Sequence, residues 1–207
     1  MIRIHLKMKL STFYKIYFRH RITKANFILK IYLYISLLFR YLLNLIYFEK
    51  KINLDEVSKK KGFLYNENLH YLFEYFNSDK GYKFVDQYPE PFKRRNNNIK
   101  VQAHGYSEFY EKYFNHFKEK KINILEIGSF YGNASAAMYF YFKNAKIYGA
   151  DINPDMFKYT SNRLESFFVN SSSRDSINEN IVKKNTSFEI IIEDASHFLK
   201  DQILSLF

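Results

Sequence analysis

Two glycines and an aspartate have the residue types and spacing of a nucleotide-binding site. Gly128 ends the apolar run 122–128, and Gly132 precedes residues 134–142, which are good helix formers. A glycine turn between a strand and a helix lets the backbone approach a ligand, and the helix N-terminus accepts negative charge. Asp151 ends a second apolar run 23 positions after Gly128, where an acid can bind ribose hydroxyls. These residues predict the βα unit of a Rossmann-like fold.

A neighbouring acid bears on the class of cofactor. The spacing of Gly128 and Asp151 fits both a dinucleotide and S-adenosylmethionine. Glu126 stands just before the first glycine, and the chain has no Gly-x-Gly-x-x-Gly pattern. This combination favours S-adenosylmethionine.

Three stretches, 124–128, 145–152 and 188–197, resemble the class I S-adenosylmethionine-dependent methyltransferases. More narrowly, they are similar to the macrocin O-methyltransferase-like group, whose members methylate sugar hydroxyls on natural products. Two upstream stretches, 78–81 and 104–114, fit the same group. The resemblance runs from about residue 78 to residue 207 and does not include the basic N-terminus.

The resemblance implies how the cofactor is held. Glu126, Gly128 and Gly132 would shape the pocket for the methionine part, and Asp151 would hold the ribose hydroxyls. After its third strand the family usually has an acid that binds the adenine amino group. Asn170 stands at that point of this chain, and its amide can make one such hydrogen bond.

The resemblance also implies catalytic groups. In the family, strand four ends in Asp-Asp-Gly-Ser-His, where an Asp binds a divalent metal and the His acts as general base. Residues 193–197 are Glu-Asp-Ala-Ser-His, so Asp194 and His197 match. An imidazole titrates near neutral pH and can take the proton of a sugar hydroxyl. A magnesium ion on Asp194 would make that hydroxyl more acidic and orient it.

A structural alternative for the same residues stays open. Asp194 and Ser196 could cap the helix that follows, which would leave His197 as a surface residue in its first turn. The family resemblance favours the functional interpretation.

The pattern predicts the elements that position these groups. We expect strands at 122–127, 146–151, 166–170 and 188–193, with a helix starting at Ser196. The fold class is then α/β, a Rossmann-like class I methyltransferase sheet of strand order 3-2-1-4 with an N-terminal helical extension. The family fold continues through further strands that supply more metal-binding acids. We therefore expect later strands to be missing, an exposed edge at strand four and weak activity of the truncated chain.

The residues before this sheet divide into two parts. Helical spacing at 64–76 and 107–121 predicts two helices, and we expect 62–121 to be a helical lead-in that contributes to the active site. Residues 122–207 then form a partial cofactor-binding domain. Residues 1–61 carry 14 Lys and Arg against 3 acids, whereas 62–207 carry 18 of each, so the whole net charge of +11 lies in the first segment. Because a nucleic-acid binder would more often carry its basic patch on the folded domain, we expect no nucleic-acid partner.

Residues 27–48 are apolar and long enough to span a bilayer, but Lys30 and Arg40 interrupt them. On a helical projection these basic residues gather on one side, opposite Ile31 and Leu38. The pattern predicts an amphipathic helix. It could lie on an anionic membrane surface, span the membrane, or pack its apolar face on the domain or on a partner.

Composition excludes several classes of protein. The 207 residues have room for one domain and an appendage, and 47% hydrophobic residues allow a sizeable core. The absence of cysteine excludes disulfides, thiolate zinc sites and a cysteine nucleophile.

We expect a cytoplasmic O-methyltransferase, membrane-associated through residues 27–48, that uses S-adenosylmethionine, with magnesium implied by the family. The acceptor would be a hydroxyl of a sugar-containing small molecule or glycan, and an oligomer is compatible with the sequence. Two alternatives stay open. The chain could be an inactive or cofactor-binding-only fragment of such an enzyme, or a membrane-associated binding protein that acts through its basic N-terminus.

Overall fold

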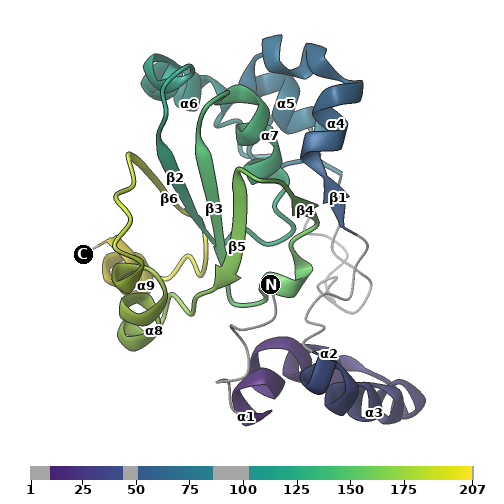
Figure 1. Cartoon of the computed structure of the whole chain (residues 1–207). Helices are drawn as coiled ribbons and strands as arrows, with labels where there is room; N and C mark the ends of the chain where they lie inside the picture. Colours follow the sequence, from purple (N-terminus) through teal and green to yellow (C-terminus); the bar gives the residue numbers. More distant parts are fainter. Residues whose placement is uncertain (1–9, 44–50, 86–102, 207) are drawn as a thin grey trace.

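The computed structural model describes residues 10–43, 51–85 and 103–206. Its centre is a parallel sheet in the order β5-β3-β2-β6 (Figure 1). The strands are β2 (Asn123–Ile127), β3 (Lys146–Asp151), β5 (Leu164–Phe168) and β6 (Ile190–Glu193). This arrangement confirms the Rossmann-like α/β class and the predicted order 3-2-1-4.

The sheet has two buried faces because successive side chains of a strand point to opposite sides. Ile124 of β2 pairs with Ile147 and Ile190, and all three belong to the larger core cluster on one face. Leu125 and Ile127 belong to a second cluster on the other face. Covering helices on both sides explain why the central strands β2 and β3 are buried almost throughout, whereas the edge strands β5 and β6 are only partly buried.

The first face is covered by α7 (Asn133–Tyr141), all of whose residues are buried. Behind it lie η2 (Gly62–Asn66), α5 (Leu69–Tyr75) and α6 (Ser107–Phe114), the last continued by η4 (Asn115–Phe117). The helix predicted over 64–76 is therefore split. The side chain of Asn68 accepts a hydrogen bond from the Tyr71 N–H and starts a new helix at α5.

The second face is covered by α8 (Arg174–Asn180) and α9 (Leu199–Leu206), with η6 (Val182–Lys184) following α8. Ile177 of α8 is buried in the cluster of this face, and Leu204 of α9 packs against it. The predicted helix at Ser196 begins instead at Leu199. The intervening residues form a loop at the end of β6.

A small second sheet joins residues 52–60 to this domain. β1 (Ile52–Asn53) pairs in parallel with β4 (Tyr159–Thr160), and α4 (Leu54–Lys60) follows β1 directly. Leu54 is fully buried in the larger core cluster. The end of the basic segment 1–61 is thus part of the main core.

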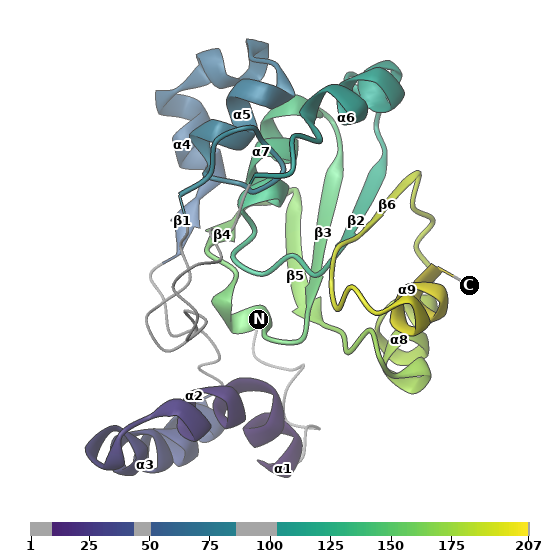
Figure 2. The same ribbon diagram turned by 180° about the vertical axis from the view of Figure 1, so that it is seen from behind.

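The described N-terminal residues form a helical unit, which we define as residues 10–43. It comprises α1 (Leu10–Phe13), η1 (Tyr14–Phe18), α2 (Arg19–Lys24) and α3 (Phe27–Leu43). Figure 1 and the view from behind in Figure 2 show it beyond the carboxyl ends of β3 and β5. Its own small core is built around Phe13, Phe18 and Leu33. The remainder of the predicted helix 27–48, residues 44–48, lies outside the described residues.

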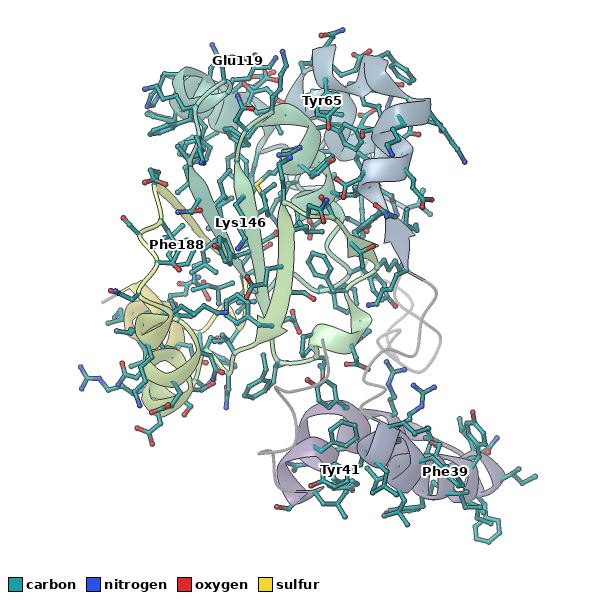
Figure 3. The ribbon with its side chains drawn as sticks, viewed as in Figure 1. Phe39, Tyr41, Tyr65, Glu119, Lys146 and Phe188 are labelled. Carbon is teal, nitrogen blue, oxygen red and sulfur yellow. The ribbon has the colours of Figure 1, made fainter. Side chains whose placement is uncertain are left out.

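The helix α3 turns its predicted apolar face outwards. Leu33 and Leu37 are its buried residues, whereas Ile35 and Leu38 are more than half exposed. Figure 3 labels Tyr41, which packs edge-on against Phe13 with ring centroids 5.5 Å apart, and Phe39, which is 65% exposed. None of the helices in the described parts of the chain is long and apolar enough to cross a membrane.

Candidate active site

A cavity of about 540 Å³ lies at the carboxyl ends of the sheet strands. The loops after β2, β3, β5 and β6 line it, together with residues 78–80 from the segment after α5. Ligands of open parallel sheets bind at this edge, because the loops there converge where the strand order reverses. The cavity brings together six of the seven residues predicted for the site: Glu126, Gly128, Asp151, Asn170, Asp194 and His197.

Gly132 is the predicted site residue that does not line this cavity. Its φ of 76° is left-handed, and a Cβ there would meet the Phe157 ring at 2.6 Å. Gly128 has a φ of 89°, and its Cβ would lie 2.5 Å from the backbone carbon of Asp194. Sequence reasoning gave both glycines the task of letting a ligand approach. In the structure, both glycines avoid a clash with other parts of the protein. At Gly128 the clash would be with the loop after β6, which lies against the loop after β2.

Asp151 is held at the tip of β3 by the backbone around it. Its Oδ2 accepts a hydrogen bond from the Phe130 N–H and its Oδ1 from the Asn153 N–H, both at 2.8 Å. Burial raises the pKa of Asp151, and these backbone donors oppose that rise. Each oxygen can accept a further hydrogen bond, so the carboxylate is a preoriented acceptor on the cavity wall.

Asn170 follows β5 on the wall of the same cavity. Its Oδ1 accepts a hydrogen bond from the Ser172 N–H at 3.1 Å, and its own N–H donates to Ser176 Oγ at 2.9 Å. These bonds fix the turn into α8. An adenine amino group needs an acceptor, so Asn170 Oδ1 would have to serve that group and Ser172 together.

Lys80 is a residue of this cavity that sequence reasoning missed. The stretch 78–81 supported the family resemblance, but it gave this lysine no role. The Lys80 side chain is only 4% exposed, and its Nζ lies 2.6 Å from Asp194 Oδ2 and 3.3 Å from Glu126 Oε1. A third carboxylate, Asp79, is 3.7 Å away.

The charges around Lys80 are mutually dependent. Burial alone would lower the pKa of Lys80, but Glu126, Asp194 and Asp79 raise it above its usual range. The side chain is therefore an ammonium. Burial raises the pKa of Glu126, while Lys80 and a 2.5 Å hydrogen bond from Ser135 Oγ favour its charged form.

Backbone pairing holds the Lys80 segment against the sheet. The Tyr106 N–H donates to the Lys80 carbonyl at 2.9 Å, and the His104 N–H donates to the Asp79 carbonyl at 2.6 Å. The two upstream stretches of the family resemblance thus pair with each other. Their contact explains how a lysine 114 positions away reaches Asp194.

The loop after β6 carries Asp194 and His197. His197 Nε2 lies 3.6 Å from Asp194 Oδ1, and the imidazole is 68% exposed at the wall of the cavity. His197 has a left-handed φ of 60°. Ser196 Oγ accepts from the Phe198 N–H and donates to Asp201 Oδ2, so Ser196 stabilises the start of α9. Asp194 instead uses one oxygen for Lys80, which separates its role from helix capping.

The fit of a magnesium ion depends on the donor set. Within residues 10–43, 51–85 and 103–206, no group of three or more His, Cys, Asp or Glu side chains could hold a metal ion. Asp194 is one carboxylate donor, and Lys80 already engages its Oδ2. The described residues therefore fit a metal poorly, whereas the cavity and its acceptors suit a nucleoside.

Comparisons with known proteins give limited likeness. No protein-family profile matches the sequence, and no curated protein matches it. One solved structure similar to the chain is MycE methyltransferase from the mycinamycin biosynthetic pathway in complex with Mg and SAH. The identity is 22% and the TM-score 0.39, over 49% of this chain and 28% of that chain. A complex of MycE with Mg, SAH and mycinamycin VI has 21% identity and a TM-score of 0.38, over 48% of this chain and 28% of that chain. The chain thus spans less than a third of the length of the solved structures it matches.

Proposed function

We propose that this chain binds S-adenosylmethionine at the carboxyl edge of its sheet and supports methyl transfer to a hydroxyl of a sugar-containing acceptor. The observation that carries the proposal is the convergence of Glu126, Asp151 and Asp194, from three different strand ends, on one cavity. Their order along the chain is the order that the methyltransferase resemblance requires. Asp151, a preoriented acceptor, would take the ribose hydroxyls.

The charge of the cavity also suits this cofactor. Glu126 and Asp194 lie beside the one Lys80 ammonium, and Asp79 and Asp151 place two more carboxyl groups on the wall, so acids outnumber cations there. A net negative site attracts a cationic sulfonium, and low local dielectric strengthens that attraction.

His197, supported by Asp194, would remove the proton of the acceptor hydroxyl. S-adenosylmethionine supplies an electrophilic methyl group: the acceptor oxygen forms the new bond to carbon, and the sulfur keeps the electron pair of the broken bond. The hydroxyl proton must leave in the same step, and the His197 imidazole at the cavity wall can take it at Nδ1, because its Nε2 faces Asp194. Asp194 Oδ1, 3.6 Å from the other ring nitrogen, Nε2, would stabilise the imidazolium that forms.

Calorimetric titration tests the cofactor assignment. S-adenosylmethionine and S-adenosylhomocysteine should bind, and NAD should not. Asp151→Ala should weaken binding by about 1–3 kcal/mol, because hydrogen bonds to a charged acceptor are lost. Asp175→Ala, which removes an exposed acid of α8, is the matched control and should leave the affinity unchanged. Tight NAD binding, or equal effects of the two substitutions, would refute the assignment.

We also propose a second activity, association of α3 with an anionic membrane surface. Eleven apolar residues of α3 are at least 44% exposed, among them Phe27, Ile28 and Leu42. An exposed apolar patch of this kind marks an interaction surface, and the +11 excess of residues 1–61 favours an anionic partner. The anionic cytoplasmic leaflet is the surface that fits both features.

Vesicle flotation tests the membrane proposal. The chain should float with anionic vesicles and less with neutral ones, and high salt should reduce the bound fraction. Leu38→Asp together with Leu42→Asp should abolish flotation. Ile203→Asp, at a half-exposed apolar position on α9, is the control and should not. Flotation that survives the α3 double substitution would show that another surface binds.

A further inference from the structure

Lys80 is the one lysine among the described residues that line the cavity, and four acids line the same cavity. Two of those acids, Glu126 and Asp194, lie within 3.3 Å of its Nζ. A buried ammonium in such a place has a large electrostatic effect, because little water screens it.

The position of this ammonium is fixed rather than adaptable. The backbone on both sides of Lys80 is paired with residues 104–106, and the Ser78 Oγ accepts a hydrogen bond from the Lys80 N–H. Adding a Cβ at Gly81 would bring it to 3.2 Å from Phe73, so the turn packs closely on α5. The backbone of Lys80 is thus held in place, and its side chain reaches Asp194 from a fixed starting position.

We propose that the Lys80 ammonium takes the position at Asp194 that a divalent cation would take, so that cofactor binding and methyl transfer at this site do not depend on a metal. The inference rests on the proposed function. A magnesium ion requires several oxygen ligands in near-octahedral order, and here its first carboxylate is already neutralised. An ion on Asp194 Oδ1 would also face the nearby ammonium, and like charges repel strongly in a buried site.

Lys80 would then act as a positioning residue with an electrostatic role. Its Nζ holds Asp194 Oδ2, while Asp194 Oδ1 faces His197. Its positive charge would also stabilise negative charge that develops on an acceptor oxygen bound in this cavity. Fixed charges of this kind stabilise a transition state without reorganisation during the reaction. A metal would supply the same charge in a different way.

Metal binding and cofactor binding can be measured separately. Manganese, a paramagnetic substitute for magnesium, can be titrated into the full chain and followed by electron paramagnetic resonance, with and without S-adenosylmethionine. We expect no stoichiometric manganese site in the wild-type chain. The dissociation constant for S-adenosylmethionine should differ by less than about twofold between EDTA and millimolar magnesium.

Lys80→Met should open the site to a metal, because it leaves Asp194 and Glu126 without their cation. We expect this variant to bind manganese and to gain thermal stability from magnesium, and Lys80→Met/Asp194→Asn to lose both effects. Lys83→Met, at an exposed lysine of the same segment, should behave as the wild type. Lys80→Arg, which keeps the charge, should bind no manganese, and the wild-type titration decides the question even where Lys80→Met does not fold.

A stoichiometric manganese site in the wild-type chain, or cofactor binding that EDTA abolishes, would overturn the inference about Lys80. Failure of the wild-type chain to bind S-adenosylmethionine under both conditions would instead refute the proposed function. The two failures are therefore distinguishable.

Discussion

Helices α3 and α7 are both apolar, yet they have opposite environments. All nine residues of α7 are buried, whereas α3 buries Leu33 and Leu37 and exposes eleven apolar side chains. α7 packs on the sheet with α5 and η2 behind it, while α3 packs on η1 and α2. An apolar helix surface needs neighbours to cover it, and the outward apolar face of α3 lacks them within the described residues. Apolar composition predicts both helices, but only the fold assigns one to the core and the other to a surface.

Residues 1–61 also differ in charge from the rest of the chain, and a buried ion pair is one of the contacts that join the two regions. All the net positive charge of the sequence lies in residues 1–61. Arg21 of α2 binds the fully buried Asp155 through its Nη2 at 2.5 Å, and the Lys51 Nζ donates to the Asp155 carbonyl. Asp155 belongs to η5 (Pro154–Met156), just after the candidate ribose residue Asp151. The contact ties the basic segment to the loop that lines the cavity.

The largest effect should come from the glycine at the crossing of the β2 and β6 loops. Gly128→Ala should destabilise the fold by about 4 kcal/mol or more, since the Cβ meets the Asp194 backbone and the residue keeps a left-handed φ. Gly62→Ala is the matched control, because nothing lies within 4 Å of its Cβ. Urea unfolding measures both. Similar stability of the two variants would mean that the loops do not cross as described.

Breaking the contact between the two regions should have the next largest effect. Arg21→Met should cost about 3 kcal/mol in the free energy of unfolding, because it leaves a buried carboxylate without its cation. Arg21→Met/Asp155→Asn should recover part of that loss, since the unpaired charge is then gone. If the double variant is as unstable as the sum of the two single variants, the ion pair does not connect the regions.

A smaller effect is expected at Asp55, which links α4 to the turn between β4 and β5. Burial alone would raise the pKa of Asp55, but hydrogen bonds from the Asn162 N–H, Ser161 and Tyr139 lower it below the usual 3.8. A lowered pKa in the folded state stabilises the fold above the unfolded value, and this contribution is lost as the pH falls through the folded value. Asp55→Asn should therefore cost about 1–2 kcal/mol at neutral pH and progressively less below about pH 4. Thermal unfolding across that range checks it, and a gap that does not narrow in acid would contradict the charge-based explanation.

The smallest loss of stability is expected on the exposed face of α3, and it can be compared with the same substitution in the buried core. Leu42→Ala on α3 should change stability by less than about 0.5 kcal/mol, because the side chain is already 78% exposed. The same change at the fully buried Leu72 of α5 should cost about 2–5 kcal/mol. Equal losses at the two positions would mean that the outer face of α3 is covered in the folded chain.

The sequence predicted much of the sheet because its strands are short apolar runs with clear ends. β3 agrees with the predicted range 146–151, but β5 begins two residues earlier than predicted. The position of β5 is set by its pairing with β3, in which Asp151 lies opposite Phe168. Residue propensities do not predict which residues of two strands pair. Helix α9 begins later than predicted because the residues after β6 form other contacts. Asp194 accepts a hydrogen bond from Lys80, and Ser196 donates one to Asp201.

The cavity was harder to predict than the sheet. Six predicted residues line it because the carboxyl ends of parallel strands must meet at one edge. Lys80 was not predicted as a partner, since its contacts with Glu126 and Asp194 exist only after residues 78–81 fold against 104–106. A lone lysine in a polar stretch carries no local signal of burial.

Hydrogen–deuterium exchange of the full chain tests whether the carboxyl edge of the sheet is the cofactor site. Addition of S-adenosylmethionine should slow exchange in residues 128–133, 151–153, 169–172 and 194–197 and leave α3 unchanged. Anionic vesicles should slow exchange in α3 and leave the four loops unchanged. Absence of protection in the loops at saturating S-adenosylmethionine, or protection confined to the N-terminal helical unit, would contradict the claim that the carboxyl edge of the sheet is the cofactor site.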